Sequence, residues 1–257
     1  MATAGTVVIL AAGQGTRMRS ELPKVLHELE GRPLLGWVLD QALALEPARV
    51  IVVVGHRGDD VRSWVQGAYP AAGDIRFVTQ AEQLGTGHAV LQCVPELEGA
   101  PGPVVVLYGD MPLLQVASLV ELCATQTRFG AAILTAEPSE PRGFGRIVRD
   151  DRGQFRAIVE EKDASDAERA IREVNVGVYA FGAEGLLRSL PRLSNDNAQG
   201  EYYLTDVLDL LLGDGESVAT VRLADEREAI GINTVEHLEE ARAVVVERAA
   251  GDTNPSR

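Results

Sequence analysis

The sequence predicts an α/β protein with a doubly wound, mostly parallel β-sheet and a β-rich lobe in its second half. Continuous apolar, β-branched runs recur along the first half, and stretches long enough for helices separate them. Unbroken apolar strands, rather than alternating ones, are typical of a parallel sheet that helices cover on both faces. The expected strands are 6–10, 50–54, 104–107 and 131–135, and the expected helices are 34–45, 59–66, 87–94 and 118–129.

Shorter elements are expected after residue 136. Two apolar segments flank a turn at 150–153 and predict a β-hairpin. We expect one domain over 1–250, with halves at 1–136 and 137–250, and a polar, disordered tail at 251–257. The elements expected in the second half are strands at 145–149, 155–160, 173–181 and 220–223, and helices at 161–172, 184–190, 203–212 and 235–250.

Composition excludes several classes of protein. The formal charge of the 257 residues is −14, which argues against a nucleic-acid partner because there is no basic field to replace phosphate counterions. Cys93 and Cys123 are the only cysteines, so neither a disulfide scaffold nor a zinc knuckle is expected. No apolar run approaches the roughly 18 residues that a membrane helix needs. The first strand lacks the basic flank of a signal peptide, so we expect a cytoplasmic protein with no membrane partner.

The most informative segment is the glycine loop after the first strand. Small residues and two glycines, Gly13 and Gly15, precede a basic residue, Arg17. Small side chains let main-chain N–H groups approach an anion, so the loop suits a phosphate, although a tight strand-to-helix turn would have the same pattern. Met18 stands where a dinucleotide fingerprint needs its third glycine, and no P-loop Gly-Lys-Ser/Thr follows.

A proline and a lysine, Pro23 and Lys24, follow this loop. Together with the loop they resemble the opening signature of the sugar-1-phosphate nucleotidyltransferases. The resemblance implies that the loop wraps a nucleoside triphosphate and that Arg17 and Lys24 act as catalytic residues on its phosphates. The loop residues that it assigns to substrate binding are Leu10, Ala11, Ala12, Gly13 and Gly15.

A second motif, at 80–89, resembles a signature of the bacterial N-acetylglucosamine-1-phosphate uridyltransferases within that family. It implies that Gln80, with the main chain of Gly85 and Thr86, contacts the uracil. An amide or backbone donor–acceptor pair suits a pyrimidine edge, and Thr86 can also cap the helix that begins here. We expect His88, early in that helix, to have a structural role.

A carboxylate, Asp110, follows the strand at 104–107. Ligands of open α/β sheets bind beyond the carboxyl ends of the strands, so Asp110 is a candidate ligand for Mg²⁺, which uses only one or two protein oxygens. The segment 231–233 resembles the family's Gly-x-Asn element, which implies that Asn233 is the second ligand and also contacts substrate. Tyr108 and Gly109 are expected to line the substrate site.

Three segments of the second half, 143–148, 158–163 and 173–177, resemble the sugar-site strands of the uridyltransferases. By that resemblance Gly145, Glu160 and Asn175 hold the sugar, and 197–206 lines its acetamido side. An exposed hairpin with an ion pair between Glu160 and Lys162 is the alternative. The halves 1–136 and 137–250 would then bind the nucleotide and the sugar, respectively.

The resemblance implies transfer of uridylyl from UTP to N-acetylglucosamine 1-phosphate, with Mg²⁺, to give UDP-N-acetylglucosamine for cell-wall precursor synthesis. Another nucleotide or sugar phosphate, or a non-catalytic nucleotide-sugar-binding module, remains an alternative. A dehydrogenase is disfavoured because Gly55 and His56, not an acidic residue, follow the second strand. No six-residue apolar repeat follows residue 235, so we expect no β-helix acetyltransferase domain in this chain. Because such a domain supports oligomers in the family, a homo-oligomer of this chain remains an open alternative.

Overall fold

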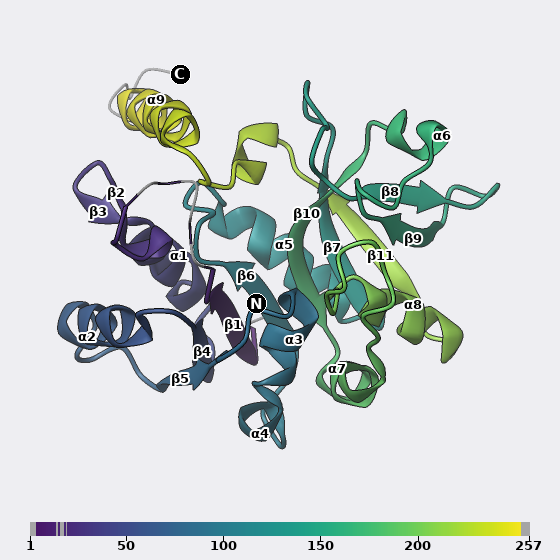
Figure 1. Cartoon of the computed structure of the whole chain (residues 1–257), viewed down its shortest axis with the longest axis horizontal. Helices are drawn as coiled ribbons and strands as arrows, with labels where there is room; N and C mark the ends of the chain where they lie inside the picture. Colours follow the sequence, from purple (N-terminus) through teal and green to yellow (C-terminus); the bar gives the residue numbers. More distant parts are fainter. Residues whose placement is uncertain (1–3, 14, 16–17, 19, 253–257) are drawn as a thin grey trace.

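A mixed β-sheet forms the centre of the molecule (Figure 1). The computed structural model describes residues 4–252 apart from 14, 16, 17 and 19, and over these residues the sheet has nine strands. Seven of them form one continuous path in the order β11-β7-β10-β6-β1-β4-β5. Their bounds are β1 (Thr6–Ala11), β4 (Arg49–Val54), β5 (Ile75–Thr79), β6 (Val104–Tyr108), β7 (Ala131–Ala136), β10 (Val174–Phe181) and β11 (Val218–Arg222).

The sheet is mostly parallel, as predicted. β1 pairs in parallel with β4 and β6, and β4 pairs in parallel with β5. β10 enters between β6 and β7 and is antiparallel to both. The second half therefore contributes strands to the same sheet as the first, and the predicted division at residue 136 is not a break in the core.

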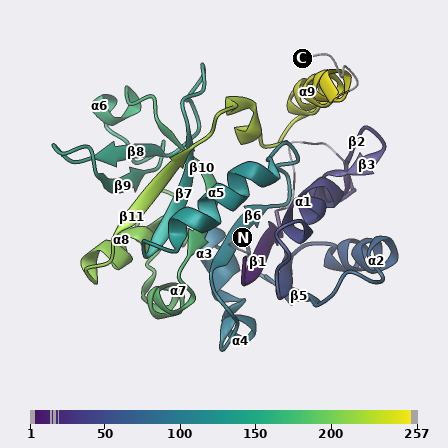
Figure 2. The same ribbon diagram turned by 180° about the vertical axis from the view of Figure 1, so that it is seen from behind.

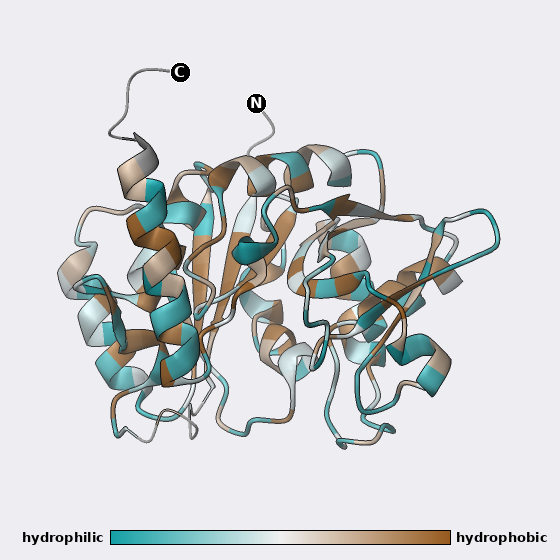
Figure 3. Cartoon of the chain, turned by 90° about the horizontal axis from the view of Figure 1, so that it is seen from above, coloured by the Kyte–Doolittle hydropathy of each residue, from teal (hydrophilic) through white to brown (hydrophobic). Residues whose placement is uncertain are grey.

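Helices cover both faces of the sheet, which is the doubly wound arrangement that the apolar strands predict. Val7 and Ile9 of β1 pack on one core cluster, while Val8 and Leu10 pack on the other. Helices α3 and α5 lie on opposite faces (Figures 1 and 2), and the central strands are mostly hydrophobic (Figure 3). The covering helices are α1 (Leu34–Leu43), α2 (Gly58–Ala68) and α5 (Val116–Gln126) on the first cluster, and α3 (Thr86–Leu91), α4 (Val94–Leu97), α7 (Ala183–Ser189) and α8 (Asp206–Gly213) on the second.

The remaining elements extend this core. Helix α9 (Val235–Asp252) packs on the small hairpin of β2 (Glu28–Leu29) and β3 (Arg32–Pro33). The hairpin of β8 (Arg146–Arg149) and β9 (Phe155–Val159) confirms the prediction and pairs with the start of β10. Within the described chain no helix is long and apolar enough to cross a membrane.

Several sequence-based expectations are wrong. The helix expected at 161–172 is only α6 (Asp166–Arg169). A capping box of Ser165 and Glu168 starts the helix at this point. None of the helix residues is buried, so no packing stabilises a longer helix. Neither β5 nor the β2–β3 hairpin was expected. Helix α9 continues to Asp252, so the first two residues of the expected tail are helical, and the tail residues 253–257 lie outside the described chain.

Candidate nucleotide and metal site

A cavity of about 240 Å³ opens at the carboxyl ends of the parallel strands. In a parallel sheet this edge collects the loops that follow the strands, which is why ligands bind there. Most residues that the sequence assigned to the nucleotide do line it. The lining residues are Leu10, Ala12, Gly13, Lys24, Val25, Gln80, Gln83, Gly85, Thr86, Ala89, Tyr108, Asp110 and Glu201.

Lys24 joins the two predicted metal ligands. Its ammonium Nζ donates to the carboxylate of Asp110 and, over 3.1 Å, to Oδ1 of Asn233. The three residues come from the 3-10 helix Lys24–Leu26, the end of β6 and the segment before α9. A positive charge therefore already lies between the two oxygens.

The local backbone explains why these side chains meet. The N–H of Ile232 donates to the main-chain oxygen of Asp110 over 2.9 Å, which ties the Gly-x-Asn segment to the end of β6. Gly15 has a positive φ of 61°, and a Cβ at that position would lie 2.6 Å from Lys24 Cβ. Only glycine lets the loop pass this close to Lys24.

The donor set fits a hard divalent cation. A carboxylate and an amide oxygen are ligands that Mg²⁺ prefers, and both already accept from a cationic group. In the part of the chain that the structure describes, no group of three or more His, Cys, Asp or Glu side chains could hold a metal. An ion at Asp110 and Asn233 would therefore complete its coordination with substrate and water oxygens.

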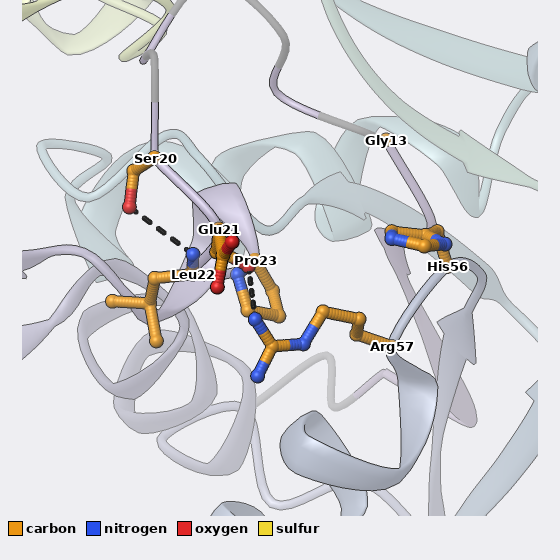
Figure 4. A pocket seen from close by; sticks show the side chains of 7 residues that line it. All are labelled: Gly13, Ser20, Glu21, Leu22, Pro23, His56 and Arg57. Atoms are coloured by element: carbon orange, nitrogen blue, oxygen red, sulfur yellow. Dashed lines mark hydrogen bonds between the residues drawn. The ribbon is translucent and has the colours of Figure 1, made fainter.

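The phosphate side of the loop is described only in part. Arg17, the second predicted catalytic residue, lies outside the described residues. Gly13 lines both the nucleotide cavity and a neighbouring one of about 400 Å³, shown in Figure 4. In that view the Arg57 side chain reaches toward Glu21, and the Arg57 guanidinium donates a hydrogen bond to the main-chain oxygen of Glu21.

Gln80 lies at the base end of the cavity, directly after β5. Its main-chain N–H donates to the oxygen of Val54 over 2.8 Å, and the residue is only 4% exposed. The side-chain Nε2 lies 3.0 Å from the oxygen of Gly85 and 3.1 Å from His88 Nδ1. His88 thus has the structural role expected of it, and its partner is the residue assigned to the base.

The start of α3 differs from the expectation in one detail. Gly85, with a φ of 106°, is the N-cap, and Thr86 makes no capping hydrogen bond. The Thr86 hydroxyl instead accepts from Leu204 N over 3.2 Å. A Cβ on Gly85 would lie 2.6 Å from Tyr202 O, so the segment at 201–204 closes directly over this helix end.

The three residues assigned to the sugar lie together beside Tyr108, although they do not line the nucleotide cavity. Asn175 donates its N–H to Gly145 O over 2.8 Å, and a Cβ on Gly145 would lie 3.4 Å from Glu160 Oε2. The Asn175 amide also shapes β10, because its Oδ1 accepts from Gly177 N and its Nδ2 donates to the Tyr179 hydroxyl. Among the described residues, the second hydrogen of Nδ2 has no acceptor.

The surroundings of these three residues are acidic. Burial raises the pKa of Glu160, and the charges of Asp206 and Asp163 raise it further, while Thr205 donates a hydrogen bond that opposes the rise. Burial likewise raises the pKa of the Tyr108 hydroxyl well above its ordinary value. Lys162 donates to Gln199, and no ion pair joins it to Glu160 within the described chain, which argues against the exposed-hairpin alternative.

Four more of the predicted residues do not line the cavity. Asn233 contacts Lys24, Gly15 packs on Lys24, and Gly109 donates its N–H to Leu10 O over 2.9 Å. Ala11 is a buried residue of β1. The lining residues that sequence reasoning missed are Val25, Gln83, Ala89 and Glu201.

The missed residues left a signal in the sequence. Val25 follows Lys24, Gln83 and Ala89 belong to the 80–89 motif, and Glu201 belongs to the 197–206 match. Treating each motif as a continuous lining segment, rather than selecting its polar residues, would have found them.

Comparisons with known proteins agree with this geometry. The family model described as a MobA-like NTP transferase domain matches residues 7–211. Two relatives named bifunctional protein GlmU are 53% identical over 227 residues (Pseudomonas paraeruginosa) and 51% identical over 231 residues (Bordetella parapertussis). The matches cover 88% and 89% of this chain but 48% and 50% of the relatives, so the chain spans about half their length.

A solved structure has the same fold. UDP-glucose pyrophosphorylase in complex with UDP-glucose superposes with a TM-score of 0.77 at 16% identity. The superposition covers 96% of this chain and 100% of that one. The mostly parallel sheet with an inserted antiparallel strand is thus shared by proteins of very different sequence.

Proposed function

The chain belongs to the family of MobA-like NTP transferase domains, and from that premise we propose that it transfers uridylyl from UTP to N-acetylglucosamine 1-phosphate. The products would be UDP-N-acetylglucosamine and pyrophosphate. The observation that carries the proposal is the junction of Lys24 with Asp110 and Asn233 beside the glycine loop. The name of the GlmU relatives supports the choice of a sugar nucleotidyltransferase.

The reaction would be a direct displacement. A phosphate oxygen of the sugar 1-phosphate attacks the α-phosphorus of UTP, the bond from that phosphorus to the bridging oxygen breaks, and pyrophosphate leaves with the electron pair. No protein nucleophile is needed, so catalysis rests on positioning and on charge neutralisation. With a chain charge of −14, a local cation is needed to hold phosphates, and Lys24 supplies one.

Asp110 and Asn233 would hold Mg²⁺, which when bound offsets negative charge on phosphate oxygens. Tyr108, the last residue of β6, lines the nucleotide cavity. Burial and the charges of both Glu160 and Asp110 raise its pKa, so it would lie near both substrates. Glu160 would accept hydrogen bonds from sugar hydroxyl and acetamido groups, and Asn175 would donate hydrogen bonds to them.

The base pocket supports uracil over cytosine. Both hydrogens of Gln80 Nε2 are directed at protein acceptors, so the side chain offers Oε1 to a ligand. Uracil presents an N3–H donor at that edge, whereas cytosine presents a lone pair. Such an enzyme would work in the cytoplasm, where nucleoside triphosphates are made, and an assembly of several chains remains a prediction.

The proposal is tested by pyrophosphate release from N-acetylglucosamine 1-phosphate and Mg²⁺ with each of UTP, CTP, dTTP, GTP and ATP. Release that is specific to UTP supports it. Release with another nucleotide keeps a nucleotidyltransferase but overturns the base assignment. Folded protein that releases no pyrophosphate with any of them overturns the proposal and favours a non-catalytic binding module.

A further inference from the structure

The side-chain amide of Gln80 has a direction that its surroundings determine. Nε2 is 3.0 Å from Gly85 O and 3.1 Å from His88 Nδ1. A main-chain carbonyl can only accept, so the nitrogen of this amide, and not its oxygen, must face Gly85. The second hydrogen of Nε2 then points to His88, and Oε1 lies on the opposite side of the amide.

The protonation of the His88 ring follows from this contact. Because Gln80 donates to Nδ1, that nitrogen carries no hydrogen, and the ring hydrogen lies on Nε2. His88 Nε2 is 3.0 Å from the side-chain amide of Gln92, one turn further along α3. In the structure Nε2 of Gln92 faces the ring and also lies 3.4 Å from the main-chain oxygen of His88. Because a neutral imidazole has one N–H and one acceptor nitrogen, its two nitrogens cannot both accept. The Gln92 amide must therefore turn its oxygen to the ring hydrogen and give up this longer contact. Gln92 therefore fixes the ring, and the ring fixes Gln80.

His88 has no direct contact with the cavity. Gln80 and Gly85 are among the residues that line it, and His88, behind them, is not. Its ring packs near that of Tyr202, with 6.1 Å between the centroids. Gln80 is the lining residue whose side chain His88 contacts by a hydrogen bond, so it can carry an effect of His88 to a ligand.

We infer that His88 is a positioning residue that keeps Gln80 Oε1 directed at the base and so determines the preference for uracil. This inference rests on the proposed function. Uracil N3–H needs an acceptor and cytosine N3 needs a donor, so an amide that turned over would reverse the match. Without the acceptor at position 88, Gly85 alone would oppose that turn.

The experiment compares His88→Leu, which removes the acceptor, with His88→Asn, whose Oδ1 can take the place of Nδ1. Pyrophosphate release is measured with UTP and with CTP at saturating sugar phosphate and Mg²⁺. We expect His88→Leu to lower the ratio of kcat/KM for UTP to that for CTP about tenfold, mainly through a higher KM for UTP. His88→Asn should restore the wild-type ratio. Thermal unfolding checks that each variant folds, and His88→Ala replaces the leucine variant if that one does not.

The outcomes are distinguishable. If the wild type prefers UTP and the folded leucine or alanine variant has the same ratio of kcat/KM for UTP to that for CTP, this inference is overturned and the proposed function is not. Equal losses with UTP and CTP, or a loss that His88→Asn does not reverse, also overturn it, because a merely structural role would have that effect. A wild type without preference for UTP overturns the proposed function and this inference with it.

Discussion

The ammonium of Lys24 lies 3.1 Å from Oδ1 of Asn233, although the two residues are 209 positions apart in the chain. The same ammonium donates to the carboxylate of Asp110. A lysine cation and a divalent metal ion bound to these two oxygens would lie within a few ångströms of each other and would repel each other. Lys24 and the metal should therefore compete, and a lysine displaced from Asp110 is available to phosphate oxygens.

Replacing Lys24 with methionine, which keeps most of its length but no charge, tests this competition. We expect pyrophosphate release to fall by about 10²- to 10³-fold, because a group that neutralises phosphate charge is lost. In the absence of nucleotide, Mn²⁺ should bind more tightly than to the wild type, as electron paramagnetic resonance titration can measure. Weaker Mn²⁺ binding would show that the ammonium does not compete for the site.

The charge of Asp110 is tested by Asp110→Asn, which keeps the shape of the side chain. Loss of the anionic ligand should lower turnover by about 10³-fold while the far-UV circular dichroism stays that of the wild type. Asp151→Asn, an exposed carboxylate in the β8–β9 turn, is the matched control and should keep full activity. Near-wild-type turnover in the Asp110 variant would rule out Asp110 as a metal ligand.

The two loop glycines should differ in their tolerance of alanine. At Gly15 a Cβ would meet Lys24 Cβ at 2.6 Å and the φ of 61° is strained for alanine. At Gly13, among the described residues other than its chain neighbours, no atom lies within 4 Å of the added Cβ. Gly15→Ala should therefore displace Lys24 and lower kcat/KM for UTP at least tenfold, since strain of this kind costs about 1–3 kcal/mol. Gly13→Ala should have a smaller effect. Equal kinetics in the two variants would contradict the close approach at Gly15.

The strands of the parallel core were predictable because each is a continuous apolar run. The observed β1, β4, β6 and β7 begin and end within one residue of their predicted bounds. In contrast, β5 contains Arg76 and is only half buried, so its pattern is not that of a core strand. The antiparallel entry of β10 depends on tertiary pairing, which no local pattern reports.

For the site, the motifs predicted the residues but not their contacts. The sequence assigned Lys24 to phosphate and Asp110 to metal, and nothing in a spacing of 86 positions indicates that the two pair directly. Similarly, a structural role for His88 was predictable but its partner Gln80 was not, because the return of α3 toward Gln80 is set by packing.

The acidic group of Glu160, Asp163 and Asp206 makes the stability of the fold depend on pH. Burial, with the charges of Asp209 and Asp163, raises the pKa of Asp206 from 3.8 to about 6. Between pH 4 and 6 the Asp206 carboxyl is protonated in the folded protein but ionised in the unfolded chain. The free energy of unfolding therefore falls as the pH rises through this range, because the buried carboxyl must ionise.

Asp206→Asn removes that cost. At pH 7 the variant should be about 1 kcal/mol more stable than the wild type after solvent screening, a rise of roughly 2–4 °C in Tm, and at pH 4 the two should unfold together. Asp214→Asn is the control, because Arg192 lowers the pKa of Asp214 and the substitution should not stabilise. Thermal unfolding at both pH values measures this, and equal stabilisation by Asp206→Asn at both would contradict a raised pKa.

The most direct test of uridylyl transfer at the Lys24–Asp110–Asn233 site follows the label of UTP into the products. With UTP labelled at the α-phosphate, N-acetylglucosamine 1-phosphate and Mg²⁺, all label that leaves UTP should appear in UDP-N-acetylglucosamine. With UTP labelled at the γ-phosphate, it should appear in pyrophosphate. Label from the γ-phosphate in inorganic phosphate, or no transfer of α-label to the sugar by folded protein, would contradict attack at the α-phosphorus and with it the proposed function.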